Sequence, residues 1–430
     1  MQQEDKKALK YHSEGRPGKI EVMPTKPLRN HEEIALAYSP GAITPAIGIS
    51  KNVWNAYKYT NKGNLVAIIS NGSNISEGKN LGAAAAKPLL EGRSMLFKVY
   101  ADIDAFDIEI AEENSNRLIE IIVSMAPTFG AIELSGIESQ KCYLIEKQLR
   151  KLLDIPVIND NICGKAVCCA AAIMNATEFA CKEIENLKIV QSSSDEAISR
   201  MLLAIGIKQE NIVTLGNDEE RNPSTSIANA DVFIGLSKEC VIKEDDISSM
   251  SHDPIILLLS TAIGIDFERV RKIRPDAIFA TCNPDLPNQI NEFISFPYIF
   301  RAALDTLACS IDEKMLLAAV KAIAQLARRP VPASLKRKYK KEFVYNREYI
   351  LPLPNDRRLA TEVTVAVAKT AIESGIARHT ITDWEDYNNT LLSRLEREYS
   401  FCREIFGHHR SNNKLRRRYT RSLPDIVSYN

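Results

Sequence analysis

Apolar positions along the chain form short continuous runs that alternate with segments of helical spacing. Continuous β-branched runs are typical of buried strands, and strict alternation is typical of a strand with one exposed face. Strands are therefore predicted at 65–70, 95–100, 103–110, 129–134 and 155–159, and helices at 81–88, 116–124, 139–153 and 163–180. The Pro and Gly residues that crowd the first forty positions predict turns and loops there rather than helix.

The pattern becomes a regular repetition of strand and helix from residue 187 onward. Strands are predicted at 188–190, 211–215, 231–235, 254–259 and 276–280, and helices at 311–328 and 361–374. Such repetition is typical of a doubly wound parallel sheet, so the predicted fold class is α/β. The basic run 336–341 is interpreted as a solvated surface. From Arg410 to Arg421 six residues are Lys or Arg and none is acidic, which predicts a mobile tail.

Composition and charge narrow the functional classes. Lys plus Arg and Asp plus Glu both number 55, so no overall field would attract nucleic acid or a membrane. No apolar run reaches the roughly 18 residues that a bilayer helix needs, and the start carries no apolar signal segment. The nine cysteines are an odd number without a C-x-x-C pair, which indicates reduced thiols and predicts a cytoplasmic location.

The stretch from Ile155 to Ala166 is the predicted centre of the chemistry. It reads as a short buried strand that ends in a polar turn and then enters an Ala-rich helix. Strand ends of this kind hold ligands in α/β proteins, so Asp160 is a candidate for a metal ion or a proton transfer. Its neighbours suit such work poorly, because Asn161 is neutral and Cys163 offers only a soft thiol.

A series of segments, in one order along residues 8–395, resembles the bacterial-type malic enzymes. The segments are Tyr11–Ile20, Leu36–Gly41, Lys62–Val66, Lys87-Pro88 with Glu91-Gly92, Asp102–Ile108, Ala230–Phe233, Arg274–Ala277, Pro287–Asn291 and Phe296–Arg301. The resemblance implies a family reaction in which malate is oxidatively decarboxylated to pyruvate and CO2 with NAD or NADP and a divalent metal, Mg²⁺ or Mn²⁺.

The same resemblance implies the domain organisation. We expect an N-terminal malic-enzyme-type domain at 1–163, a shortened Rossmann-like NAD(P)-binding-type domain at 164–310 and a C-terminal helical region at 311–395. A basic tail at 396–430 stands where larger relatives carry a phosphotransacetylase-like domain. Because relatives assemble, the expected state is a homo-oligomer, or a hetero-oligomer with an active paralogue.

Four working residues of the family have counterparts here by resemblance. Tyr38 and Lys87 match the family's acid and base, Asn288 matches a substrate contact, and Asp160 matches an acid next to the metal. A lysine at the end of an alanine run is expected to be buried, which predicts a lowered pKa for Lys87.

The family's metal carboxylates, in contrast, are replaced. The resemblance places a Glu-Asp pair after the third strand and a second Asp after Asp160, where this chain carries Ser135, Gly136 and Asn161. Carboxylate charge holds Mg²⁺ in such sites, and these three residues supply none. A relocated site that uses Glu133 or Glu138 remains open.

The cofactor loop has also diverged. A dinucleotide-binding fold needs a glycine-rich turn after its first strand, so that the pyrophosphate can approach a helix N-terminus. This chain has no glycine there, and its degenerate cofactor positions are Ser192, Ser193 and Ser194. Asp195 and Glu196 are expected in the first helical turn, where they would repel a phosphate. Other replaced family positions are Ser76–Lys79, the ribose acid near Gly216 and Asp218, and Thr261–Ile263.

Three functional hypotheses follow. The first is a malic-enzyme homologue that has lost catalysis and acts as a pseudoenzyme, binding a partner or a malate- or pyruvate-like metabolite. The second is an active malic enzyme with rearranged metal and cofactor sites, since Tyr38, Lys87 and Asn288 remain. The third is an interaction protein whose basic tail engages RNA, an anionic surface or another subunit.

Overall fold

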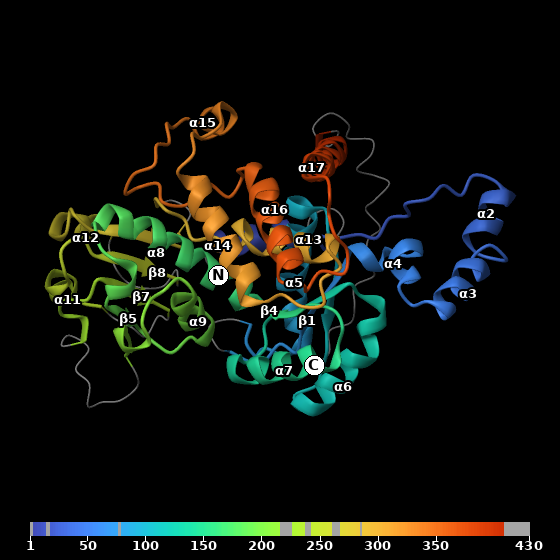
Figure 1. Ribbon diagram of the computed structural model, residues 1–430, viewed down its shortest axis with the longest axis horizontal. Helices are drawn as coiled ribbons and strands as arrows, with labels where there is room; N and C mark the ends of the chain where they lie inside the picture. Colours follow the sequence, from blue (N-terminus) through green and yellow to red (C-terminus); the bar gives the residue numbers. More distant parts are fainter. Residues whose placement is uncertain are drawn as a thin grey trace.

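Two parallel β-sheets organise the protein. The computed structural model describes residues 3–13, 18–75, 79–215, 226–236, 242–259, 267–283 and 286–407, with side chains described to residue 396. The sheets lie side by side, with helices packed around both of them (Figure 1). The predicted α/β class is confirmed. The replaced positions at 76–78, 216–218 and 261–263, and the tail from residue 408, lie outside the described residues.

The first sheet has the strand order β2-β1-β3-β4, and every neighbouring pair is parallel. Its strands are β1 (Leu65–Ser70), β2 (Asp104–Glu109), β3 (Ala131–Leu134) and β4 (Val157–Asn159). Its helices are α5 (Ala83–Ala101), α6 (Ser115–Met125) and α7 (Ser139–Leu152). Because all four strands run the same way, the residues that follow them meet at one edge of the sheet. That edge is where the candidate residues after β3 and β4 come together.

The second sheet is also fully parallel, with the order β6-β5-β7-β8-β9. Its strands are β5 (Ile189–Gln191), β6 (Ile212–Thr214), β7 (Val232–Gly235), β8 (Ile255–Leu258) and β9 (Ile278–Thr281). Its described helices include α9 (Glu196–Ala204), α11 (Glu244–Ser249) and α12 (Phe267–Ile273). The strand order reverses between β5 and β7, which is the switch point where doubly wound folds bind ligands.

A buried helix, α8 (Val167–Ala180), packs in the core that the two halves share. A single π-helical turn, Ile162–Ala166, leads into it. By length and composition alone the stretch Ile162–Ala180 could cross a membrane, but 78% of it is buried inside the protein. Its apolar surface is therefore covered by neighbouring helices. Asn175 fixes this packing, because its amide donates to the carbonyls of Ala324 and Ile350 at 2.9 and 2.8 Å.

The C-terminal helices cover this core (Figure 1). They are α13 (Phe296–Asp305), α14 (Glu313–Ala327), α15 (Ala333–Tyr339), α16 (Arg358–Glu373) and α17 (Trp384–Gly407). Short 3-10 turns lie at Asn61–Asn64, Ala126–Thr128, Ile184–Asn186, Gln209–Asn211 and Glu292–Ile294, the last of which is η6. Domain boundaries at 163/164, 310/311 and 395/396 stay predictions.

Two predictions about local structure are wrong. Residues 95–100, predicted as a strand, continue helix α5, because Leu90, Ser94, Phe97 and Ala101 are buried at helical spacing. A short apolar run cannot by itself distinguish a buried strand from a buried helix.

The first forty residues, predicted as loops, contain α1 (Gln3–Ser13) and α2 (His31–Ala37). The side chain of Asn30 begins α2 by accepting a hydrogen bond from the Glu33 backbone at 2.8 Å. Pro and Gly lie in the segments between these helices. Because they are so frequent there, the sequence pattern did not indicate the helices themselves. Helices α3 (Ile43–Lys51) and α4 (Asn55–Tyr59) follow.

Candidate functional site

Asp160 lies at the carboxyl edge of the first sheet, directly after β4, where the sequence predicts it. Its Oδ2 accepts a hydrogen bond of 2.6 Å from the hydroxyl of Ser135, which follows β3. Burial raises the pKa of Asp160 and the charge of Glu292 adds to this, while Arg93 and the Ser135 hydroxyl oppose it. Ser135 and Asp160 therefore lie together, but the Ser135 hydroxyl only donates a hydrogen bond to the carboxylate and brings no charge.

Gly136, at the second position of the Glu-Asp pair that the resemblance implies, brings no side chain at all. Its φ of +65° lies in the left-handed region that favours glycine. A Cβ built there would lie 2.8 Å from both Ser70 Oγ and Ile75 Cδ1. The third expected position, Asn161, is neutral, and its backbone N–H donates to Asn159 Oδ1 at 2.9 Å. None of these three positions offers a metal carboxylate.

Glu133, the open candidate for a relocated metal site, is fully buried and already paired. Arg93 on α5 donates to it twice, from Nε to Oε2 at 2.5 Å and from Nη2 to Oε1 at 2.8 Å. The remaining edge of the guanidinium donates from Nη1 to Glu292 Oε2 at 2.9 Å. The Phe296 ring lies 4.0 Å from Arg93 Cζ. A bidentate pair of this kind leaves Glu133 little capacity for a metal.

The charge states around Arg93 follow from burial and from its neighbours. Burial lowers the pKa of Arg93, but Glu133, Glu292 and Asp160 outweigh this and raise it well above its ordinary value, so the guanidinium stays charged. Burial raises the pKa of the Cys163 thiol well above its ordinary value, so this neighbour, 3.8 Å from Glu133 Oε1, stays protonated. The residues present at this edge do not fit the divalent metal that the family implies.

Lys87 lies near the start of α5, and its ammonium pairs with two carboxylates of β2. Nζ makes a short ion pair with Asp107 Oδ2 and lies 3.8 Å from Glu109 Oε2. Burial lowers the pKa of Lys87, but the hydrogen bond and charge of Asp107, together with Glu109 and Glu91, outweigh it and raise the pKa overall. The predicted lowering of this pKa is therefore wrong, because the side chain is half-exposed and faces acids.

Tyr38 does not join Lys87 within one copy of the chain. It ends helix α2 and its side chain is exposed. Helix α2 lies at the far edge of the molecule, well away from α5 (Figure 1). The proposed acid and base of the family are thus both present, on separate parts of the fold.

The Asn288 side chain is engaged by the protein's own backbone. Its amide nitrogen donates to the carbonyls of Phe279 and Arg347, both at 2.7 Å, and its Oδ1 accepts from the Ile350 N–H at 2.8 Å. These bonds hold a residue with φ of +54°. Asn288 therefore joins three chain segments, and its contact with a substrate stays a prediction.

The cofactor edge of the second sheet is closed by its own hydrogen bonds. The Ser192 N–H donates to Ile234 O at 2.9 Å, and its hydroxyl accepts from the Leu236 N–H at 2.8 Å, which joins the ends of β5 and β7. Asp195 caps α9, as predicted, and its Oδ1 accepts from the Ile198 N–H at 3.0 Å. The helix N-terminus that would face a pyrophosphate carries a carboxylate instead, so these residues fit a dinucleotide poorly. Ser193 is half-buried and Ser194 exposed.

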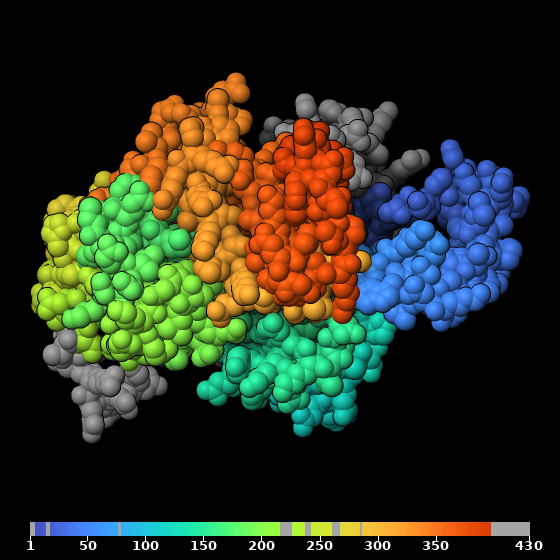
Figure 2. All heavy atoms as spheres, viewed as in Figure 1, coloured from blue at the N-terminus to red at the C-terminus, as the bar shows by residue number. Residues whose placement is uncertain are grey.

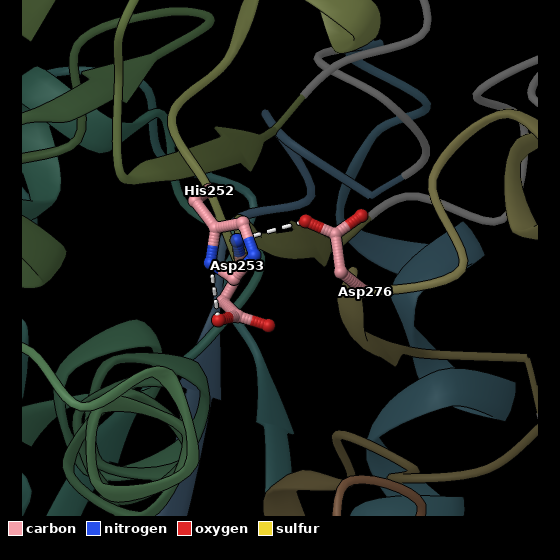
Figure 3. A group of neighbouring side chains, drawn as sticks. All are labelled: His252, Asp253 and Asp276. Atoms are coloured by element: carbon pink, nitrogen blue, oxygen red, sulfur yellow. Dashed lines mark hydrogen bonds and ion pairs between the residues drawn. The ribbon is translucent and has the colours of Figure 1, made fainter.

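A separate cluster of potential metal ligands was not predicted. Within the described residues, the side chains of His252, Asp253 and Asp276 lie within 4.8 Å of one another (Figure 3). His252 and Asp253 precede β8, and Asp276 precedes β9. The cluster therefore lies at the edge of the second sheet that is opposite to the ligand edge of a parallel sheet. Arg347 Nη1 pairs with Asp253 at 2.6 Å, and Arg274 binds Asp276 through two nitrogens at 3.0 and 2.8 Å. Both carboxylates are therefore neutralised, and the cluster is structural.

The Arg93 network was not predicted from the sequence. A signal was available, because the neighbouring α5 positions Leu90, Ser94 and Phe97 are buried at helical spacing. A charged residue within such a stripe requires a buried partner. That partner, Glu133, is forty positions away along the chain, and Glu292 is 199 positions away.

The fold and the site define a two-sheet α/β protein whose second sheet has the doubly wound order of nucleotide-binding folds. The chain belongs to the malic enzyme family. The family description "Malic enzyme, N-terminal domain" matches residues 17–150.

Relatives and solved structures agree with this assignment. The probable NADP-dependent malic enzyme of Rickettsia prowazekii is 41% identical over 90% of this chain, which spans just over half (54%) of that relative. The NADP-dependent malic enzyme of Halomonas elongata is 38% identical over 86% of this chain and 94% of its own length. The crystal structure of malic enzyme from Pyrococcus horikoshii has a TM-score of 0.84 and 33% identity, covering 97% of this chain and 100% of its own.

Proposed function

We propose that this member of the malic enzyme family has lost, or nearly lost, the oxidative decarboxylation of malate and acts by binding a partner or a metabolite. The observation that carries the proposal is the metal edge of the first sheet. Ser135 bonds Asp160 there, and Gly136 brings no carboxylate. Without a cation to polarise the developing carbonyl, the family reaction loses a major source of transition-state stabilisation.

The cofactor edge supports the same proposal independently. Relatives are named as NAD- or NADP-dependent malic enzymes. In this chain the Asp195 carboxylate takes the hydrogen bond of the α9 terminus that a pyrophosphate would use. Hydride transfer needs a tightly held nicotinamide, so weak cofactor binding would suppress turnover even where a substrate binds.

A small carboxylate is the metabolite that the Lys87 ammonium favours. The Lys87 ammonium is half-exposed and keeps its charge, because its pKa is raised. Malate or pyruvate would bind by sharing this ammonium with Asp107. Lys87 is therefore not expected to accept a proton as a neutral base near neutral pH.

The test is a calorimetric titration of the full chain with NAD, NADP and Mn²⁺, followed by a malate-dependent cofactor-reduction assay on the same sample. We expect no saturable cofactor binding and no turnover above that of Lys87→Ala. Cofactor and metal binding together with turnover that Lys87→Ala abolishes would overturn the proposal. Circular dichroism on both samples controls for folding.

The alternative is an active enzyme with rearranged sites, which the retained Lys87 and Tyr38 favour. Because α2 and α5 lie far apart in one copy, both residues could act on one substrate only if a second copy supplies α2. An active enzyme of this kind would recover turnover when inactive Tyr38→Phe and Lys87→Ala proteins are mixed and allowed to exchange subunits. A mixture that stays inactive supports the pseudoenzyme.

We further propose a cytoplasmic oligomer, either of this chain alone or with an active paralogue. In the described part of the chain seven cysteines are free, which supports a reducing compartment. Tagged protein purified from its native cell should carry a malic enzyme if the assembly is mixed.

Residues 408–430 of the basic tail are a further candidate contact. Salt-sensitive binding of RNA that disappears on truncation after Gly407 would favour that role.

A further inference from the structure

The metal edge of the first sheet holds a cation that belongs to the chain. The Arg93 guanidinium contacts Glu133 and Glu292 directly, and Asp160 adds to the negative potential around it. The side chain of Arg93 is only 12% exposed and that of Glu133 is fully buried. Two buried charges of this kind are stable only as a well-bonded pair, so the two residues depend on each other.

The hydrogen bonds of Arg93 leave no edge of the guanidinium vacant. Nε and Nη2 face Glu133, Nη1 faces Glu292, and Phe296 covers one face of the plane. A metal ion that used Glu133 would have to displace both bonds of the pair. It would also have to approach a fixed positive charge across only a few ångströms, which is unfavourable in a partly desolvated site.

We propose that the Arg93 guanidinium is the cation of this sheet edge and takes the place of a divalent metal. It neutralises the carboxylates that gather at the sheet edge, and through Glu292 it joins the first sheet to η6, the turn that follows β9. The carboxylates at the sheet edge are therefore neutralised without a bound ion. Replacing Arg93 by a neutral residue leaves Glu133, Asp160 and Glu292 uncompensated, and we expect a divalent cation to bind among them once the Glu292 side chain has moved.

The new site is chemically reasonable. Carboxylate oxygens are the ligands that Mn²⁺ and Mg²⁺ prefer. The Glu292 side chain is 31% exposed, so it can move toward the ion once its arginine partner is gone. The inference deepens the proposed function, on which it rests only in taking this edge as the family's metal position.

The experiment measures Mn²⁺ binding by the full chain, from the electron paramagnetic resonance signal of free Mn²⁺. Wild-type protein and Arg93→Lys should show no saturable binding that depends on Asp160. Arg93→Met should bind at least about tenfold more tightly than wild type, the scale on which neighbouring groups alter metal affinity. The gained binding should disappear in the double variant Arg93→Met, Asp160→Asn.

Arg301→Met is the matched control. Arg301 is more deeply buried than Arg93, 3% against 12% exposed, and pairs with Asp305 at 2.7 Å, away from this sheet edge, so its loss should create no Mn²⁺ site. If Arg93→Met does not fold by circular dichroism, Arg93→Gln carries the same expectation, because its amide keeps a donor for Glu133.

Three results would overturn the inference: saturable Mn²⁺ binding by wild type that Asp160→Asn abolishes, a folded neutral variant that binds no better than wild type, or gained binding that survives Asp160→Asn. Wild-type Mn²⁺ binding at Asp160 without malate turnover would leave the proposed function intact. Turnover without such binding would overturn the proposed function and leave the inference standing.

Discussion

Lys87 matches a base of the family only by resemblance, and a base must lose a proton near neutral pH to act. Here Asp107 and Glu109 stabilise the ammonium and raise the pKa of Lys87. At the residue scale the side chain is thus better suited to bind an anion, or to neutralise β2, than to accept a proton.

Lys87→Met should lower the free energy of unfolding at pH 7 by about 1–3 kcal/mol, because Asp107 is only 3% exposed and loses its partner. Solvent screening of the half-exposed ammonium places the value toward the lower end. A raised lysine pKa stabilises the fold below the ordinary value of 10.5, and this contribution is lost as pH rises through the raised pKa. Urea unfolding of both proteins between pH 7 and pH 11 measures the difference.

The exposed pair of Lys141 and Glu138, 2.8 Å apart, provides the control. Lys141→Met should cost no more than about 1 kcal/mol, because solvent competes with such a surface pair. An equal loss in both variants, or a Lys87→Met effect that grows above pH 10.5, would contradict the prediction.

At the scale of single elements, the turn after β3 is the least replaceable part of the metal edge. Gly136→Ala should destabilise the protein by about 1–3 kcal/mol, because the left-handed backbone and the contacts with Ser70 and Ile75 both resist a side chain. The matched control is Gly92→Ala in α5, where an added Cβ meets nothing within 4 Å. That change should be neutral or stabilising by up to about 1 kcal/mol.

Urea unfolding monitored by circular dichroism tests both glycine variants. If Gly136→Ala were as stable as wild type, the turn could accept a side chain and a restored carboxylate would be feasible. The metal edge could then be rebuilt by simple substitution, which would contradict the prediction.

The elements that were predicted well from the sequence are those in which one pattern of apolar residues dominates. The run 65–70 is buried at every position and is β1 at the predicted bounds. In the second sheet β5, β7, β8 and β9 are likewise buried throughout, whereas β6 is half-buried. Residues 95–100 were assigned wrongly because their burial repeats with helical spacing inside a longer helix. The positions of Ser135 and Asp160 followed from strand ends, whereas the partners of Arg93 lie 40 and 199 positions away along the chain, so the sequence does not identify them.

At the scale of the whole molecule, helices α2 to α4 are the part that a single copy leaves uncovered. They form a lobe on one side of the body (Figure 2), and none of their residues is buried in this described segment. Large apolar side chains are exposed along it, namely Leu36, Ile43, Ile47 and Val53. Exposed apolar surface of this extent marks an interaction site, and a second copy of this chain presents the same complementary surface.

We therefore expect the wild-type chain to sediment as a dimer and the double variant Leu36→Glu, Ile43→Glu to sediment as a monomer with unchanged helix content. Charges placed in an apolar contact must be desolvated without partners, which opposes association. Leu144→Glu on α7 is the control, because Leu144 is also exposed but lies outside the lobe, and its dimer should persist. Sedimentation velocity at micromolar concentration decides between them. A monomeric wild type, or equal dissociation in the Leu144 variant, would show that the lobe is not the contact between copies.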